Sequence, residues 1–304
     1  MKIYSASDVA EKLAWPDLIA SVAHAFADPP EVPLRGHHDI DKQNSGEVTL
    51  LTMPAWRSDE YIGVKLVNVV PGNSERGLPT VVGTYVLMSA QTGETLAIID
   101  APELTARRTA ATSALAASKL AHPQAKRHLV VGGGKLSPYL AEAMRSVRSI
   151  KETRIWARNP EQAEMAAAKS ASKVANDLES AVRQADIISC VTTATSPVVF
   201  GAWLSPGSHL DLVGAFRPDM RETDDEAICN CCVFVDTIEG ALHQAGELSD
   251  PIERGVICAE DVQADLAQLI TDAHPGRQSD EQKTLFKSVG SAISDYAAAT
   301  CLLG

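Results

Sequence analysis

Apolar and polar residues follow two different periods in the first 120 positions of the chain. Residues 8–27 carry apolar side chains at helical spacing, which predicts two short helices with Asp8 and Asp17 as caps. Residues 47–99 instead form short β-branched and apolar runs that turn clusters separate, which predicts an antiparallel sheet. An alanine-rich helix is expected over residues 105–120, with a face that suits tight packing.

The stretch from 128 to 160 has the clearest pattern of the chain. A short apolar run at 129–131 is followed by three glycines, by helical spacing over 137–147 and by a second apolar run at 154–156. This succession of strand, glycine turn, helix and strand is typical of the first βαβ unit of a dinucleotide-binding domain. Glycine lets the backbone approach a pyrophosphate, and the helix N-terminus offers free N–H groups. A plain tight turn is the alternative interpretation.

The glycine fingerprint and the end of the second strand indicate which dinucleotide binds. The fingerprint reads Gly132-x-Gly134-x-x-Ser137, with a small serine where glycine or alanine is usual. The second strand ends in Arg158 and Asn159 and lacks the carboxylate that would accept hydrogen bonds from the ribose hydroxyls of NAD. Because Arg158 can pair with a 2′-phosphate, we expect NADPH to be preferred and NADH to be the second choice. A solvated arginine at a strand end is the alternative.

Strand-like and helix-like segments keep alternating beyond this unit. Apolar runs at 186–191, 208–213 and 232–236 predict further strands of a parallel sheet, with ligands at their carboxyl ends. The last stretch, 283–304, is apolar and is expected to be helical and to return to the first domain. The predicted fold class is therefore α/β, with two domains. They are a Rossmann dinucleotide-binding domain over 121–282, and a discontinuous α+β substrate-binding and dimerisation domain with an antiparallel sheet over 1–120 and 283–304.

Composition narrows the classes of partner. The net charge is −12 and no basic block occurs, which argues against nucleic acid and anionic membrane surfaces. The first residues lack the apolar core of a signal peptide, and no stretch reaches the length of a membrane span, so we expect the protein in the cytoplasm. The six cysteines are then thiols. The cluster Cys229-Asn230-Cys231-Cys232 lacks C-x-x-C spacing and a second ligand pair, so we expect no metal site.

Six short blocks stand out beyond these patterns. They are Gly63-Val64-Lys65, residues 71–73 with 77–80, residues 104–111, the glycine turn, Val213-Gly214-Ala215, and residues 284–290. In this order, and over nearly the whole chain, they resemble the ornithine cyclodeaminase/mu-crystallin family. That family includes ornithine cyclodeaminases, archaeal alanine dehydrogenases, reductases of cyclic ketimines and vertebrate mu-crystallin, which binds thyroid hormone. The resemblance implies a homodimer built through the antiparallel sheet domain, with cofactor and substrate meeting in the cleft between the domains.

The resemblance also implies which residues form the site. The cations that act on the substrate would be Arg35, Lys65 and Arg108. The dinucleotide would be held by Thr80, Arg108, Gly132, Gly134, Lys135, Leu136, Arg158, Asn159, Thr192, Val213 and Ser288. The relatives handle α-imino and α-amino acids, whose carboxylate an arginine fork can bind with two parallel hydrogen bonds. An ordinary surface charge is the alternative for each cation.

Reduction of a cyclic ketimine needs a hydride and a protonated imine nitrogen. We expect Arg35 and Arg108 to hold the substrate carboxylate, with Lys65 as the third cation. Lys65 could donate or relay the proton, directly or through water, if the two arginines depress its pKa. His37 and His38 stand beside Arg35 and are further candidates for proton transfer, or else a solvated pair.

Two departures from the family pattern favour its reductase branch. Cyclodeaminases resemble one another in carrying Glu before a Met-Pro pair, whereas this chain has Leu51, although Glu47 lies nearby. They also carry Asp after two glycines of a late Rossmann strand, whereas this chain has Ala215, with Asp219 shortly after. We therefore expect NADPH-dependent reduction of small cyclic ketimine acids, from Δ1-pyrroline-2-carboxylate to L-proline and from Δ1-piperideine-2-carboxylate to L-pipecolate. The alternatives are an ornithine cyclodeaminase, an alanine-type amino-acid dehydrogenase, and a mu-crystallin-like protein that binds a small ligand.

Overall fold

The computed structural model describes residues 1–40 and 48–304, and the chain divides into two compact units. The first unit comprises Met1–Arg108 with Ala292–Gly304, and the second comprises Thr109–Ser291. Both boundaries differ from the expected ones. One falls inside helix α3 (Ala101–Leu120), and the other follows strand β14 (Thr284–Lys287), which pairs with strands of the second unit.

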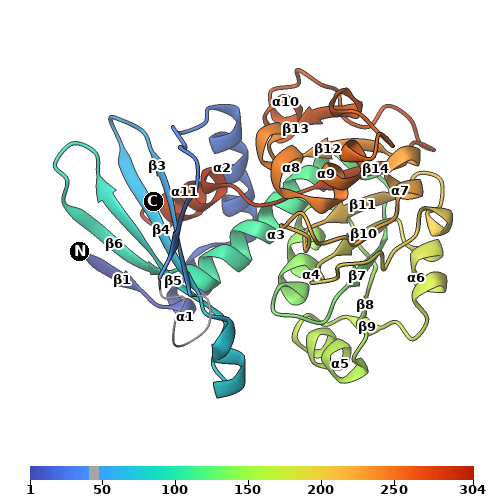
Figure 1. Cartoon of the computed structure of the whole chain (residues 1–304), viewed down its shortest axis with the longest axis horizontal. Coiled ribbons are helices and arrows are strands. Elements are labelled where there is room, and N and C mark those ends of the chain that lie inside the picture. The colour runs from blue at the N-terminus through green and yellow to red at the C-terminus, as the bar shows by residue number, and fades with distance from the viewer. Residues whose placement is uncertain (41–47) are drawn as a thin grey trace. The chain divides into compact units, whose positions relative to one another are not determined.

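The described part of the first unit is built on a six-stranded sheet in the order β1-β6-β5-β4-β3-β2 (Figure 1). Its strands are β1 (Lys2–Tyr4), β2 (Gly36–Asp39), β3 (Thr49–Trp56), β4 (Tyr61–Val69), β5 (Val81–Ser89) and β6 (Thr95–Asp100). Strands β2 to β6 pair antiparallel, and the predicted β runs correspond to β3, β4, β5 and β6. β1 pairs with β6 in parallel, so the sheet is mixed and the prediction of an antiparallel sheet is wrong at this edge. The run that forms β1 precedes the stretch from which the sheet was predicted.

The two faces of this sheet differ in what covers them. One row of direct cross-strand neighbours is buried, namely Met53, Lys65, Tyr85, Ile99 and Tyr4. Helix α11 (Ala292–Cys301) packs against β3, β4 and β5, and also against α2 (Trp15–Ala27). The alternate row on the other face is apolar and only half-buried or exposed, namely Pro54, Val64, Val86, Ile98 and Ile3.

Both helices predicted for the N-terminal region form, but their caps differ from the expected ones. α1 (Ala6–Lys12) begins after Ser5, whose hydroxyl accepts the Asp8 N–H while the Asp8 carboxylate accepts the Ser5 N–H. Asp8 is therefore the reciprocal partner in a capping box rather than the cap itself. α2 begins after Ala14, has proline in its first turn and makes no side-chain cap bond, so Asp17 is not a cap.

The second unit is built on a parallel sheet that, in the described residues, has eight strands in the order β13-β12-β14-β11-β10-β7-β8-β9. In addition to β14, they are β7 (Arg127–Val131), β8 (Glu152–Trp156), β9 (Lys173–Val174), β10 (Ile187–Cys190), β11 (His209–Leu212), β12 (Cys232–Val235) and β13 (Val262–Asp265). The chain runs outward from β7 through β8 to β9 and then returns to β10 on the other side of β7. This reversal is the switch point at which doubly wound sheets bind their ligands.

Helices connect these strands and cover both faces of the sheet. They are α4 (Leu136–Val147), α5 (Pro160–Lys169), α6 (Leu178–Gln184), α7 (Asp225–Asn230), α8 (Ile238–Gln244), α9 (Gly246–Glu253) and α10 (Leu266–Ile270). Short 3₁₀ turns occur at η1 (Pro71–Arg76), η2 (Gly201–Trp203) and η3 (Ala259–Asp261). The prediction of one apolar helix over 283–304 is wrong in its first part, because Thr284–Lys287 forms strand β14 and only Ala292–Cys301 is helical.

Alternate residues of the central strands build two separate cores. Leu129, Ile188 and Leu210 belong to a large apolar cluster with residues of α6, α7 and α8, whereas Ile187 packs with residues of α3 and α4. Strands buried on both faces are typical of a parallel sheet. Among the described residues, no helix is both long enough and apolar enough to cross a lipid bilayer.

Candidate active site

A buried ion cluster lies in the first unit, between the covered face of its sheet and α11. Lys65 Nζ is 2.5 Å from Asp295 Oδ2, and Arg108 Nε donates to Asp295 Oδ1 at 2.8 Å. The three residues are 3 %, 6 % and 0 % exposed in the order Lys65, Arg108, Asp295. Since removing charges from water is costly unless they are paired, the shared carboxylate holds both cations in fixed positions. Two cations on one carboxylate leave the cluster with a net positive charge.

Burial and charge shift the protonation equilibria within this cluster. Burial lowers the pKa of Lys65 to about 8; Asp295 opposes the shift, while Arg108 and Arg35 add to it. The two arginines therefore act in the expected direction, although burial is the larger cause. Burial alone would raise the pKa of Asp295, but Arg108 and Lys65 bring it below its usual value. Arg35 itself is half-buried in the segment that leads into β2.

The sequence patterns do not single out Asp295, although it joins the two predicted cations. It lies in α11, in the run Ala292-Ile293-Ser294-Asp295-Tyr296, and the helix has seven buried positions. A single carboxylate in an otherwise apolar helix is the signal that could have identified it, because such a group needs a buried partner.

A tyrosine ring explains the glycine of the Gly63-Val64-Lys65 block. Tyr85 is the cross-strand neighbour of Lys65, and a Cβ added to Gly63 would lie 1.9 Å from the Tyr85 hydroxyl oxygen. The hydroxyl is buried and has no hydrogen-bond partner among the described residues. Only glycine at position 63 leaves room for this ring next to the ion cluster.

The glycine turn of the second unit follows β7 and leads into α4. Gly132 has φ +133°, which favours glycine, and a Cβ there would lie 2.5 Å from the Val191 carbonyl oxygen. At Gly134 a Cβ would meet nothing within 4 Å, so the backbone beside the start of α4 stays open. Ser137 is fully buried and donates to the Gly132 carbonyl at 2.7 Å. The turn therefore fits a dinucleotide phosphate, which needs close backbone approach at a helix N-terminus.

The remaining predicted residues of the second unit lie at the carboxyl ends of its strands or beside the glycine turn. Thr192 follows β10 and Val213 follows β11, and these two strands are neighbours in the sheet. Ser288 follows β14, is buried, and donates to Asp236 Oδ2 at 3.0 Å. Lys135, which is exposed, and Leu136, which is half-buried, stand at the beginning of α4. Parallel strands present their carboxyl ends at one edge, so these residues share that edge.

Arg158 and Asn159 follow β8, where the cofactor type was inferred. Arg158 is exposed and makes no hydrogen bond or ion pair with another described residue. Asn159 caps α5, with its side chain accepting the Glu161 N–H at 3.0 Å. Asn159 therefore has a structural task that the sequence interpretation did not include. Thr80 is exposed in the first unit, just before β5.

The positions that separate this chain from cyclodeaminases hold no buried carboxylate. Leu51 is half-buried on β3 and Ala215 is buried after β11. Asp219 is exposed and pairs with Arg217 at 2.8 Å, so it is part of a surface ion pair. Glu47 lies outside the described residues. His37 and His38 are exposed on the edge strand β2.

The six cysteines are all free, and the described residues contain no group of three His, Cys, Asp or Glu arranged to hold a metal ion. Cys229 is exposed, whereas Cys231 and Cys232 are half-buried.

Comparison with known proteins identifies relatives over the full length of the chain. The profile of the ornithine cyclodeaminase/mu-crystallin family matches residues 1–303. A Δ1-pyrroline-2-carboxylate reductase of Paracoccus denitrificans is 36% identical over 309 residues, which are 97% of this chain and 94% of that protein. The structure of the Thermococcus litoralis Δ1-pyrroline-2-carboxylate reductase, in complex with NADH and L-proline, matches with a TM-score of 0.91 and 32% identity over 99% of this chain and 96% of that one.

A second solved structure differs in activity. An archaeal alanine dehydrogenase dimer with bound NAD matches with a TM-score of 0.90 and 30% identity, over 99% of this chain and 94% of that one. These similarities confirm the predicted α/β fold class and the resemblance carried by the six sequence blocks. The chain belongs to the ornithine cyclodeaminase/mu-crystallin family.

Proposed function

We propose that this protein, an NAD(P)H-dependent oxidoreductase of C=N and CH–NH bonds, reduces Δ1-pyrroline-2-carboxylate to L-proline. The six-membered homologue, Δ1-piperideine-2-carboxylate, is a second expected substrate. The observation that carries the proposal is the buried pair of cations, Lys65 and Arg108, on the single carboxylate of Asp295. Its net positive charge suits a small anionic acid, and the reductases named above are similar to this chain over nearly its whole length.

The side chains of the first unit would bind the substrate and supply the proton. Arg35 and Arg108 hold the substrate carboxylate, because a guanidinium fork matches its two oxygens. Lys65, with a pKa of about 8, is largely protonated at neutral pH and can still release its proton to an imine nitrogen. Asp295 holds Lys65 Nζ and so fixes where that proton is delivered. A reduced nicotinamide supplies the hydride when it is bound.

The alternative activities lack specific support among the described residues. A cyclodeaminase would need a carboxylate for the distal amino group, and position 51 is leucine. It would also be expected to use a carboxylate where this chain has the buried Ala215. An alanine-type dehydrogenase stays the second candidate, because the archaeal alanine dehydrogenase structure is as similar in fold as the reductase structure.

The deciding experiment measures NADPH oxidation with a panel of cyclic imino acids, alongside ammonia release from ornithine and NADH formation with alanine and NAD. We expect turnover of the five- and six-membered imino acids only. Lys65→Met should lower kcat/KM by about a hundredfold or more, the usual contribution of a proton donor. Lys119→Met, which removes a half-buried lysine paired with the exposed Asp272, is the matched control and should keep wild-type rates. Turnover of ornithine or alanine without turnover of an imino acid would assign the chain to another branch.

Preference for NADPH is proposed from Arg158, which is exposed and available for a 2′-phosphate. The solved relatives contain NADH or NAD, so the test is a direct comparison of the two donors. Arg158→Ala should raise the KM for NADPH by about tenfold, the value of one charge-assisted contact, and leave the KM for NADH unchanged. A wild-type enzyme that favours NADH would refute this assignment.

A homodimer is proposed through the uncovered face of the six-stranded sheet. Its central row, from Pro54 through Val64 and Val86 to Ile98, is apolar and only half-buried. A contiguous apolar sheet face of this kind is typical of a subunit interface. The archaeal alanine dehydrogenase of the same fold is described as a dimer.

A further inference from the structure

Glu222 places a buried carboxylate between the ends of two neighbouring strands. Its Oε1 accepts the Thr192 N–H at 2.6 Å and the Thr192 hydroxyl at 2.9 Å. Its Oε2 accepts the Gly214 N–H at 2.8 Å and the Ala215 N–H at 3.3 Å. Because all four partners are donors, an ionised carboxylate satisfies every one of them at once. Glu222 therefore ties the end of β10 to the end of β11.

The close packing at this point leaves little freedom for any other arrangement. A Cβ at Gly214 would lie 2.4 Å from Glu222 Oε1 and 2.1 Å from the Thr192 carbonyl oxygen. Glycine at position 214 is therefore what lets the carboxylate reach both strand ends. The Thr192 hydroxyl donates its proton to Glu222 and accepts the Ala194 N–H at 3.3 Å, so a ligand that binds this hydroxyl must be a donor.

Two further groups hold Glu222 from within the core. The Glu247 carboxylate accepts the backbone N–H of Glu222 and, at 3.3 Å, that of Thr223. Lys287 Nζ lies 3.5 Å from Glu247 Oε2 and donates to the Leu212 carbonyl at 3.2 Å. Glu222, Glu247 and Lys287 are all 0 % exposed. Glu247 therefore holds the backbone at Glu222 and Thr223, and Lys287 connects Glu247 to the last residue of β11.

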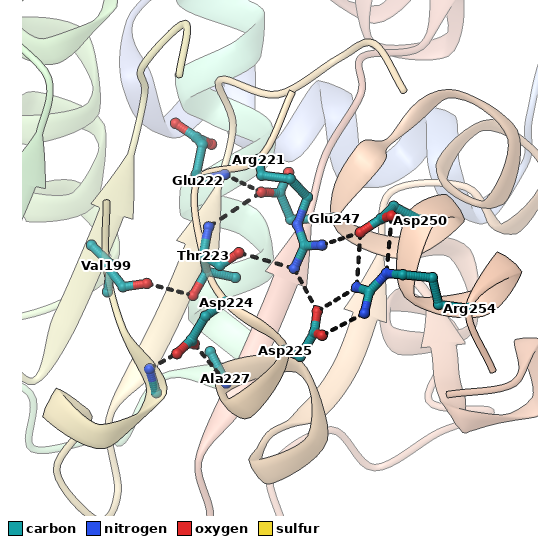
Figure 2. Close-up of polar contacts among 11 residues, drawn as sticks. Val199, Arg221, Glu222, Thr223, Asp224, Asp225, Ala227, Glu247, Asp250 and Arg254 are labelled. Atoms are coloured by element: carbon teal, nitrogen blue, oxygen red, sulfur yellow. Dashed lines mark hydrogen bonds and ion pairs between the residues drawn. The ribbon is translucent and has the colours of Figure 1, made fainter. Parts of the chain in front are cut away.

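A surface ion cluster holds the same segment from outside. The Arg221 side chain points toward α7 and α9, where it pairs with Asp225 and Asp250. Arg254 pairs with both of these carboxylates. The Glu222 carboxylate points away from this cluster (Figure 2). Consecutive residues thus face outward and inward. The outward cluster is partly exposed, with 43 % of the Arg254 side chain accessible, and ion pairs of this kind contribute little stability.

We propose that Glu222 is a positioning residue of the dinucleotide site, which holds Thr192 and the backbone after Val213 in the geometry that the dinucleotide requires. The proposal rests on the dinucleotide dependence in the proposed function, but not on the identity of the imino acid. Glu222 itself need not touch the dinucleotide. Its effect is exerted through the two strand ends that lie on either side of its carboxylate.

The test measures dinucleotide affinity by fluorescence titration of the full chain with NADPH and with NADH, in the absence of any imino acid. Glu222→Gln keeps the shape but turns an NH₂ group toward backbone N–H donors, so one strand end must move. We expect the dissociation constant to rise about tenfold or more. In turnover, the KM for the dinucleotide should rise in parallel while the KM for the imino acid stays within about twofold. A general loss of stability would not raise the KM for the dinucleotide while leaving the KM for the imino acid nearly unchanged.

Two variants accompany this measurement. Gly214→Ala disturbs the same junction without changing any charge and should weaken the dinucleotide in the same direction. Arg254→Met releases the outer ion cluster and should keep wild-type affinity, even if the melting temperature falls slightly. Wild-type affinity in a folded Glu222→Gln or Gly214→Ala protein would overturn the proposal, as would equal weakening in Arg254→Met. Failure of both junction variants to fold would make Glu222 a residue of the fold alone and would also overturn it. Since the fluorescence titration contains no imino acid, a wrong substrate assignment leaves the measured affinities unchanged.

Discussion

Replacing Asp295 with asparagine removes the single negative charge between Lys65 and Arg108 without changing the size of the side chain. Removing one partner of a buried ion pair typically destabilises a protein by about 3–5 kcal/mol, because the other charge stays buried without compensation. Lys65 can contribute only a small part of this loss. With a pKa of about 8, it can release its proton at pH 7 for about 1.4 kcal/mol, which limits its penalty. Arg108 cannot deprotonate, so the larger part of the loss comes from the guanidinium.

The pH dependence of this loss separates the two cations. The pKa of Lys65 in the folded protein lies below its ordinary value of 10.5, so the charged amine lowers the free energy of unfolding below about pH 8. That penalty disappears as the pH rises from 8 toward 10.5. In Asp295→Asn the pKa of Lys65 falls further, so its amine is already largely neutral at pH 7. The difference in the free energy of unfolding between wild type and Asp295→Asn should therefore decrease by about 1 kcal/mol between pH 7 and pH 9.5.

Urea denaturation at both pH values measures this gap. Asp272→Asn is the matched control, because it removes a carboxylate 2.7 Å from Lys119 at a site where 80 % of the aspartate side chain is exposed. We expect the control to lose less than about 1 kcal/mol. An Asp295→Asn protein as stable as the wild type, or a gap that is the same at both pH values, would refute the reasoning. In turnover, the alkaline limb of the kcat/KM profile should move to lower pH, because Lys65 loses its proton earlier.

Three further predictions concern stability, the glycine turn and assembly. Burial raises the pKa of Asp211 to about 7, so the contribution of this carboxyl group to stability is lost as the pH rises from about 4 to 7. Asp211→Asn should therefore raise the melting temperature at pH 8 and not at pH 4. A lower melting temperature at pH 8 would contradict this. Ser137→Ala removes the hydroxyl that donates to the Gly132 carbonyl. It should lower the free energy of unfolding by about 1 kcal/mol and weaken NADPH binding a few-fold. Unchanged NADPH affinity would mean that the glycine turn keeps its shape without this hydrogen bond. Val64→Lys places a charge on the uncovered sheet face and should yield a folded monomer by light scattering, so a persistent dimer would place the interface elsewhere.

The elements that depend on local pattern could be predicted from the sequence. The strand, glycine turn and helix around Gly132 form as expected, because turn chemistry and helical spacing are local signals. Strand β14 was missed, because the short segment Thr-Leu-Phe-Lys has no turn signals beside it and does not distinguish strand from helix. Its position between β11 and β12 comes from long-range pairing, which no local pattern contains.

The candidate site divides in the same way. Lys65 and Arg108 could be identified because they lie in recognisable blocks, and the structure brings both to one carboxylate. That carboxylate, Asp295, is 187 positions from Arg108, so only the packing of α11 on the sheet shows that they meet. Glu222 lies seven positions after the block Val213-Gly214-Ala215, outside it, and its role depends on four donors from two other segments.

The contact between Gly63 and Tyr85 also bears on how this protein can change over evolution. Since a methyl group at position 63 would overlap the phenolic oxygen, an alanine can be accepted there only if the aromatic side chain on the adjacent strand is replaced by a smaller one. Relatives with a residue larger than glycine at position 63 should therefore lack the tyrosine at position 85. Substitutions at these two positions should covary among the relatives.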